Sequence, residues 1–182
     1  MKMSYIVRHA AGYVAGAGVF LMGIPYGLWR LSRVEYSLFH VSIVPFLQVR
    51  VGVSVFLGLT GIVFMAWSNI VLFVQGKGGP ADIAGIAVSP RTKRLVVRGP
   101  YAYSRNPMVF GAFCIYLSIG AFLDSLWCVV IVMLFFFVMR CYITAVEEKR
   151  LVKDFGSEYE DYRNKTPMIV PLPTGSFHEK KT

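Results

Sequence analysis

The sequence has few charged residues, and acidic ones are especially scarce. Charged side chains make up 16% of the 182 residues, against about 25% in soluble domains, and only 10 residues are Asp or Glu. Hydrophobic residues reach 55%, and the mean hydropathy is +0.56. A soluble protein of this length cannot bury so much apolar surface. The composition therefore excludes an ordinary soluble domain and predicts a membrane protein.

Cysteines, internal repeats and ionisable residues within the apolar segments are also scarce. Cys114, Cys128 and Cys141 are odd in number and far apart, without metal-ligand spacing, so we predict neither disulfides nor a metal site. We read them as small buried apolar side chains. A transporter or channel is disfavoured, because transport paths usually contain ionisable residues and internal repeats.

Basic residues exceed acidic ones, giving a net charge of +9. In a soluble protein this excess would indicate nucleic acid as a partner. Here the basic residues flank apolar segments, so we expect them to contact anionic lipid and orient the chain in a membrane. The predicted partner is the membrane, and nucleic acid is not predicted.

Four apolar segments are predicted to cross the bilayer as helices: 10–29, 51–75, 107–123 and 125–143. Only Asp124 separates the last two, which predicts a tight helical hairpin. Segment 34–48 is apolar but short, and it contains Glu35, His40 and Pro45. We expect it to lie at the interface or re-enter the membrane. The fold class is an all-α membrane protein with one domain over residues 1–182.

The basic residues predict the orientation. Loop 76–106 contains six Lys or Arg and a single acidic residue, Asp82. Such an excess is typical of the cytoplasmic side. Segment 144–182 would follow on the same side as a helix that stops near Gly156 and an extended, partly disordered tail. Both termini are then cytoplasmic. The compact length and the lack of an organelle signal favour a prokaryotic inner membrane; no feature assigns an oligomeric state.

The stretch RGPYAYSRNPMVFGAF, residues 98–113, places charge directly before an apolar segment. Pro107 suits the first helical turn and Asn106 suits the N-cap, so the helix N-terminus and Arg105 together predict an anion site. Glu147 and Glu148 follow the last apolar segment at about the level of Arg105 and would hold a cation. S-adenosylmethionine carries both charges. A salt bridge that merely fixes the hairpin is the alternative.

The order of these motifs resembles the integral-membrane methyltransferases, which include isoprenylcysteine carboxyl methyltransferases and phospholipid N-methyltransferases. The similarity lies in KRLVVRGPYAYSRNPM (93–108) and EEKRLVKDFGSEYEDYRNKTP (147–167). The matching residues are Leu95, Val96, Gly99, Tyr101, Arg105, Asn106, Pro107, Glu147, Glu148, Phe155, Gly156, Tyr159, Tyr162 and Pro167. The resemblance extends over residues 76–173.

The resemblance implies a cofactor, S-adenosylmethionine, bound at the cytosolic side, and a lipid acceptor that enters between the helices. It implies Arg105 and Glu148 as catalytic residues. The implied cofactor-binding residues are Leu95, Val96, Gly99, Tyr101, Arg105, Asn106, Pro107, Glu147 and Glu148. Arg105 would hold a carboxylate or phosphate, and Glu147 or Glu148 would oppose the amino group or sulfonium.

Two departures from the family pattern bear on the acceptor. Val109 stands where the family often has Tyr, and Asn106 replaces the commoner His. Asn cannot act as a base near neutral pH, whereas His can. A prenylcysteine carboxylate and an amino lipid therefore both stay open as acceptors. A non-enzymatic membrane scaffold that retains the fold is the alternative function.

Overall fold

The computed structural model describes residues 16–39, 42–76, 82–83, 86–87 and 94–172. In this part of the chain the helices are η1 (Val19–Gly23), α2 (Ile24–Phe39), α3 (Leu47–Gly76), η2 (Gly99–Ala102), α4 (Pro107–Phe122), α5 (Leu126–Tyr142), η3 (Ile143–Glu147), α6 (Glu148–Phe155) and α7 (Ser157–Lys165). Two two-residue strands, β1 (Asp82–Ile83) and β2 (Ile86–Ala87), pair antiparallel. The predicted helical architecture is confirmed for these residues.

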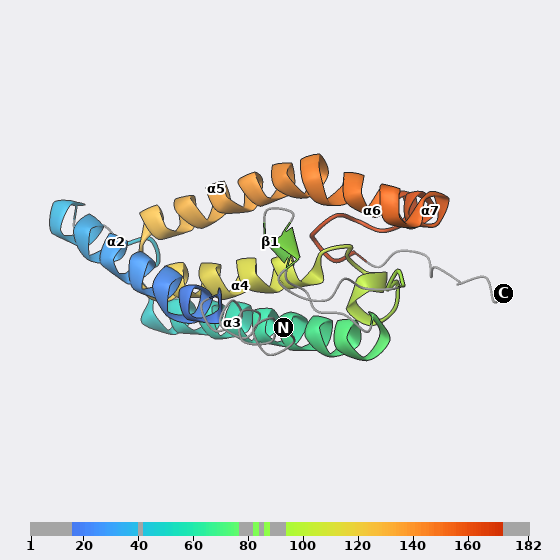
Figure 1. The fold of residues 1–182 in the computed structure, drawn as a ribbon. Coiled ribbons are helices and arrows are strands. Elements are labelled where there is room, and N and C mark those ends of the chain that lie inside the picture. Colours follow the sequence, from blue (N-terminus) through green and yellow to red (C-terminus); the bar gives the residue numbers. More distant parts are fainter. Residues whose placement is uncertain (1–15, 40–41, 77–81, 84–85, 88–93, 173–182) are drawn as a thin grey trace, which may run out of the picture.

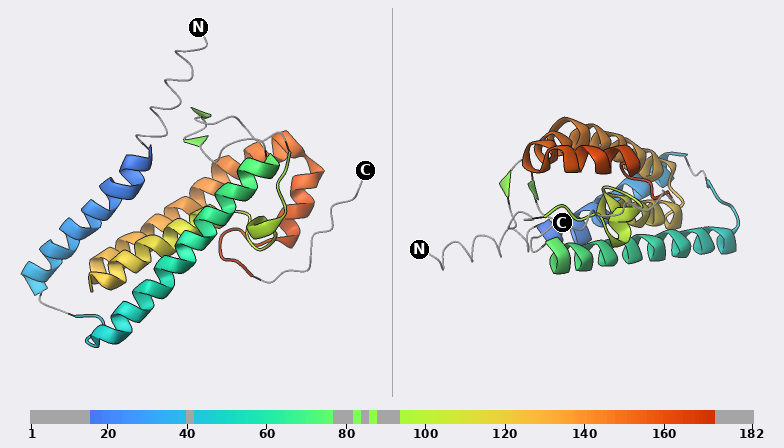
Figure 2. Two further views of the ribbon diagram at one scale, coloured as in Figure 1. Left: turned by 90° about the horizontal axis from the view of Figure 1, so that it is seen from below. Right: turned by 90° about the vertical axis from the view of Figure 1, so that its right-hand side faces the viewer.

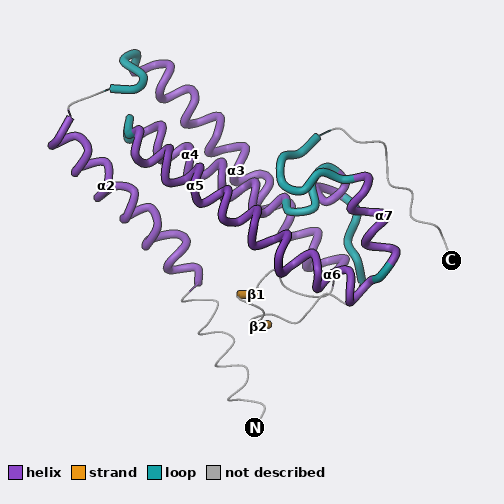
Figure 3. Tube along the Cα trace, turned by 90° about the horizontal axis from the view of Figure 1, so that it is seen from above, coloured by secondary structure: helices purple, strands orange, loops and turns teal. Residues whose placement is uncertain are grey.

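Helices α2, α3, α4 and α5 form an elongated bundle in which α4 packs against the other three (Figure 1). The connections 42–46 and 123–125 lie together at one end, which we call the turn end. Loop 94–106, α6 and α7 lie at the opposite end, which we call the loop end (Figures 2 and 3). This arrangement gathers the motifs of the second half of the sequence at the loop end.

The first helix is longer than predicted. From residue 16 it is continuous through the π-helical η1 and α2 to Phe39; residues 10–15 of the predicted segment lie outside the described part. Segment 34–48 is therefore not one interfacial or re-entrant piece. Its first residues complete α2, and its last two begin α3.

Glu35 explains why the helix continues. Its side chain is buried, accepts hydrogen bonds from the amides of Leu126 and Trp127 at 3.1 and 3.2 Å, and also accepts one from the Ser125 hydroxyl. A carboxylate at a helix N-terminus satisfies otherwise unpaired N–H groups and interacts favourably with the helix dipole. Glu35 thus caps α5 and fixes α2 against it.

Asp124 joins the two connections at the turn end. Its carboxylate accepts hydrogen bonds from the amides of Ile43 and Val44 at 2.9 and 3.0 Å and pairs with Arg50 at 3.1 Å. Its backbone has a positive φ of 53°, which a non-glycine residue adopts in a tight turn. The residue that separates the two predicted hairpin segments therefore also holds the preceding connection.

Among the described residues, two helices are long and apolar enough to cross a membrane: Leu47–Gln75, and Leu126–Phe155, which joins α5, η3 and α6. The second is longer than the predicted segment 125–143. Helix α4 is apolar but has only 16 residues, about 24 Å, against a hydrocarbon thickness of about 30 Å. Four crossings therefore stay a prediction.

Helices α3 and α4 approach most closely at two glycines. A Cβ on Gly61 would lie 2.6 Å from the backbone oxygen of Gly111, and one on Gly111 would lie 2.8 Å from the backbone oxygen of Gly61. The Ser118 hydroxyl also donates to the backbone oxygen of Ser54 at 2.8 Å. Small residues at such a crossing let two apolar helices pack without relying on the hydrophobic effect.

We expect Gly61→Ala to lower the free energy of unfolding by about 1–3 kcal/mol, because the new methyl group would overlap backbone atoms of α4. Thermal unfolding in detergent measures the effect. Gly52→Ala is the matched control, since its Cβ would meet no atom within 4 Å and alanine favours helix by up to about 1 kcal/mol. Equal stability of the two variants would contradict the proposed close crossing.

Candidate functional site

The turn that precedes α4 rests on α3. Gly99 has φ +62°, and a Cβ there would lie 3.0 Å from Val71 and 3.3 Å from the Trp67 indole nitrogen. Glycine is required both for the backbone conformation and for the close approach. Because Gly99 faces α3 and is absent from the lining of the cavity described below, its predicted cofactor contact has no geometric support in the described residues.

Arg105 and Glu148 meet at the loop end. Nη1 of Arg105 donates to Oε1 of Glu148 in an ion pair, and the two side chains are only 9% and 8% exposed. Nε of Arg105 donates to the backbone oxygen of Thr166 at 2.9 Å, and Nη1 lies 3.4 Å from the Tyr159 hydroxyl. The guanidinium is thus engaged within the protein. Such a buried pair needs both partners, since either charge alone would be left uncompensated.

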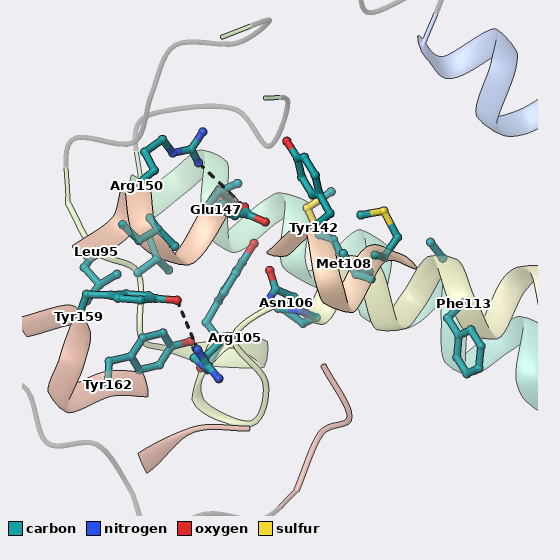
Figure 4. A pocket seen from close by; sticks show the side chains of 18 of the residues that line it. Leu95, Arg105, Asn106, Met108, Phe113, Tyr142, Glu147, Arg150, Tyr159 and Tyr162 are labelled. Carbon is teal, nitrogen blue, oxygen red and sulfur yellow. Dashed lines mark hydrogen bonds and ion pairs between the residues drawn. The ribbon is translucent and has the colours of Figure 1, made fainter. Parts of the chain in front are cut away.

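Asn106 occupies the predicted N-cap position, but its side chain does not cap α4. Nδ2 donates instead to the backbone oxygen of Met168 at 3.0 Å, and the Asn106 amide donates to the same oxygen at 3.0 Å. The side-chain oxygen therefore points away from the helix N-terminus, toward the side where Glu147 lies (Figure 4). It can accept a hydrogen bond from a ligand.

The first residues of the tail are ordered and not helical, which agrees with the predicted extended conformation, while the predicted partial disorder is not tested. Residues 166–172, which we call the carboxy-terminal strap, return to the loop before α4. The Arg105 amide donates to the oxygen of Pro167 at 2.9 Å, and the Leu172 amide donates to that of Tyr103 at 3.2 Å. Residues 173–182 lie outside the described part.

Three tyrosines, Tyr101, Tyr159 and Tyr162, lie close together at the loop end. Tyr159 and Tyr162 are buried, with ring centroids 6.2 Å apart, and the Tyr162 hydroxyl donates to the Tyr101 backbone oxygen at 2.6 Å. Burial raises the pKa of Tyr101, and the nearby charge of Glu147 raises it further. Burial also raises the pKa of Tyr159 and Tyr162. All three phenols therefore stay protonated at neutral pH; the Tyr162 hydroxyl donates to the Tyr101 oxygen, whereas the Tyr159 hydroxyl accepts from Arg105.

A cavity of about 390 Å³ lies beside these groups, within the size range of small-molecule sites (Figure 4). Its polar end includes Tyr101, Arg105, Asn106, Glu147, Arg150, Asp154, Tyr159 and Tyr162. Its apolar end, between α4 and α5, includes Val109, Ala112, Phe113, Phe135, Phe136 and Met139. Phe20 of η1 also reaches it. One space therefore joins a charged compartment to an apolar one.

The two adjacent glutamates have different surroundings. Glu148 is buried in its pair with Arg105 and is not among the residues that line the cavity. Glu147 lines the cavity with a third of its side chain exposed, and its ion pair with Arg150 is long at 4.0 Å. A partly exposed contact of this length contributes little. Glu147 is thus the carboxylate better placed for a cationic ligand.

Seven of the nine predicted site residues line this cavity, namely Leu95, Val96, Tyr101, Arg105, Asn106, Pro107 and Glu147. Gly99 and Glu148 do not line it: Gly99 lies against α3, and Glu148 pairs with Arg105. The prediction missed Arg150, Leu151, Asp154 and Phe155, which also line the cavity. Their spacing from Glu147, at three, four, seven and eight residues, is that of one helical face and was available in the sequence.

The comparison with protein-family models decides the family. The model described as phospholipid methyltransferase matches residues 49–158, which is more than half of the chain. The chain belongs to the phospholipid methyltransferase family. No curated protein and no solved structure matches the sequence. Membership in a membrane methyltransferase family, together with the two long apolar helices, indicates a membrane protein that acts on lipid-like substrates.

Proposed function

We propose that this protein transfers a methyl group from S-adenosylmethionine to a lipidic acceptor at the cytoplasmic membrane face. The observation that carries the proposal is a continuous cavity with a charged end at the loop end and an apolar end between α4 and α5. A polar cofactor and a membrane-embedded acceptor can meet in such a space without either leaving its own environment.

The residues present fit the cofactor. S-adenosylmethionine combines a carboxylate, an ammonium group and a sulfonium with an adenine ring whose flat faces are apolar. Glu147 offers a negative charge, the Asn106 side-chain oxygen accepts a hydrogen bond, and the Tyr101 phenol can donate one. Leu95, Val96 and Leu151 supply apolar wall. The volume of about 390 Å³ suits a ligand of that size.

The protein's contribution is alignment and exclusion of water. When bound, S-adenosylmethionine supplies an activated methyl group. Glu147 would hold the cationic part of the ligand at the polar end. Arg105 and Glu148, engaged with each other, would keep the loop and α6 at a fixed separation. The Phe113 and Phe136 side chains, which line the cavity with ring centroids 4.4 Å apart, would exclude water from the space in which the methyl group is transferred.

Two acceptors fit the apolar end. A prenylcysteine carboxylate would need no base. An amino lipid would have to lose a proton, and a carboxylate oxygen of Asp154 or Glu147, which both line the cavity, would take it. In either case we propose four membrane crossings with both termini cytoplasmic, because the basic residues of segments 94–106 and 149–165 gather at the loop end. A prokaryotic inner membrane is the proposed location.

The test is methyl transfer in reconstituted vesicles. We expect purified protein in phospholipid vesicles to incorporate label from methyl-labelled S-adenosylmethionine into one of two acceptors, an amino phospholipid or a prenylated cysteine. Label in the phospholipid identifies N-methyl transfer, and base-labile label in the prenylcysteine identifies carboxyl transfer. Folded protein that binds the cofactor but labels neither class would contradict the proposed acceptors. Folded protein without cofactor binding would favour a non-enzymatic scaffold.

A further inference from the structure

The carboxy-terminal strap lies beyond residue 158, where the family match ends, yet it makes most of the long-range hydrogen bonds of the loop before α4. We propose that residues 166–172 are a positioning element that sets Arg105 and Asn106 for cofactor binding. This inference rests on the proposed function, since it assigns a role in the same site.

Backbone oxygens of the strap hold each residue of loop 104–106. The buried Ser104 hydroxyl donates to the oxygen of Ile169 at 2.7 Å. The amides of Arg105 and Asn106 donate to the oxygens of Pro167 and Met168 at 2.9 and 3.0 Å. Three successive residues thus find three successive carbonyl partners about 60 positions later in the chain. The loop conformation depends on a segment remote in sequence.

The strap also orients the functional side chains themselves. The Thr166 oxygen accepts from Arg105 Nε, which directs Nη1 toward Glu148. The Met168 oxygen accepts from Asn106 Nδ2, which leaves the side-chain oxygen for the cavity. Without these acceptors both side chains would gain rotamer freedom, and binding would have to restore the order.

Ile169 anchors the strap. Its side chain is 3% exposed, whereas the neighbouring Val170 is 50% exposed. Pro167 and Pro171 restrict the backbone on either side, and neither has an N–H that would need a partner. Because the strap follows the last helix, it can detach while α3, α4 and α5 stay packed. Its release therefore perturbs the site more than the fold.

The experiment compares Ile169→Ser with Val170→Ser in the full-length protein in detergent. We expect Ile169→Ser to raise the dissociation constant for S-adenosylhomocysteine about tenfold, the size of one or two lost hydrogen bonds. Hydrogen exchange of the Arg105 and Asn106 amides should accelerate at least about tenfold. Val170→Ser should change neither the dissociation constant nor the exchange rates. Ile169→Val, which keeps an apolar side chain at the buried position, should show the wild-type values of both.

Several outcomes would overturn the inference. Unchanged affinity in Ile169→Ser with a lowered melting temperature would make the strap purely structural. Should Ile169→Ser fail to fold, Ser104→Ala removes the hydroxyl that both donates to Ile169 and accepts from the Asn106 amide at 3.1 Å, and unchanged affinity there would have the same meaning. Failure of the wild-type protein to bind would refute the proposed function instead, while the exchange measurement would still report on the strap.

Discussion

Glu148→Gln is expected to abolish methyl transfer and to lower the free energy of unfolding by about 3–5 kcal/mol. The glutamine would keep an amide oxygen as hydrogen-bond acceptor but would carry no charge, so the Arg105 guanidinium would be buried without the counter-charge of Glu148. Arg105→Ala should have a similar effect, because it strands the carboxylate instead. Urea or thermal unfolding together with methyl-transfer kinetics measures both consequences.

The double variant Arg105→Met with Glu148→Met separates stability from activity. Replacing both charges by apolar side chains of similar length removes the stranded charge, so stability should recover much of the loss. Methyl transfer should stay absent, since the ion pair that holds Arg105 of the loop to Glu148 of α6 is then gone, although the backbone hydrogen bonds to the strap remain. Full activity in either single variant would refute the assignment of Arg105 and Glu148 to the active site.

Glu147→Gln is expected to weaken the apparent affinity for S-adenosylmethionine at least about tenfold while leaving the melting temperature nearly unchanged. The carboxylate lines the cavity and is a third exposed, and its ion pair with Arg150, at 4.0 Å, is long, so its removal strands no fully buried charge. The KM for S-adenosylmethionine and thermal unfolding provide the two readouts.

Glu158→Gln makes the same chemical change on an exposed surface of α7 and serves as the control. It should alter neither quantity. If Glu147→Gln instead destabilised the protein as strongly as Glu148→Gln does, the division of roles between the two glutamates would be wrong.

The meeting of Arg105 with the Glu pair was predictable, because the arms of a helical hairpin with a short connection must be nearly equal in length. Which glutamate pairs with Arg105 was not predictable. Adjacent residues on a helix point about 100° apart, and the π-helical turn η3 shifts the helical phase directly before Glu148. The local sequence does not predict such a π-helical turn.

Contacts between remote segments account for the other differences. Glu35 was one reason to interpret segment 34–48 as interfacial or re-entrant, since a carboxylate in an apolar segment is costly without partners. Its partners, the N-terminal amides of α5, lie about 90 residues later and could not be read from the local pattern. The strap was missed for the same reason. Its proline-rich sequence resembles a disordered tail until loop 104–106 supplies donors for its carbonyls.

The most direct measurement is calorimetric titration of S-adenosylhomocysteine into the wild-type protein in lipid nanodiscs. We expect one saturable site per chain, with binding weakened by Glu147→Gln and preserved in Glu158→Gln. A folded wild-type protein that shows no saturable binding, or a Glu147→Gln variant that binds as tightly as wild type, would contradict the assignment of the cavity as the cofactor site.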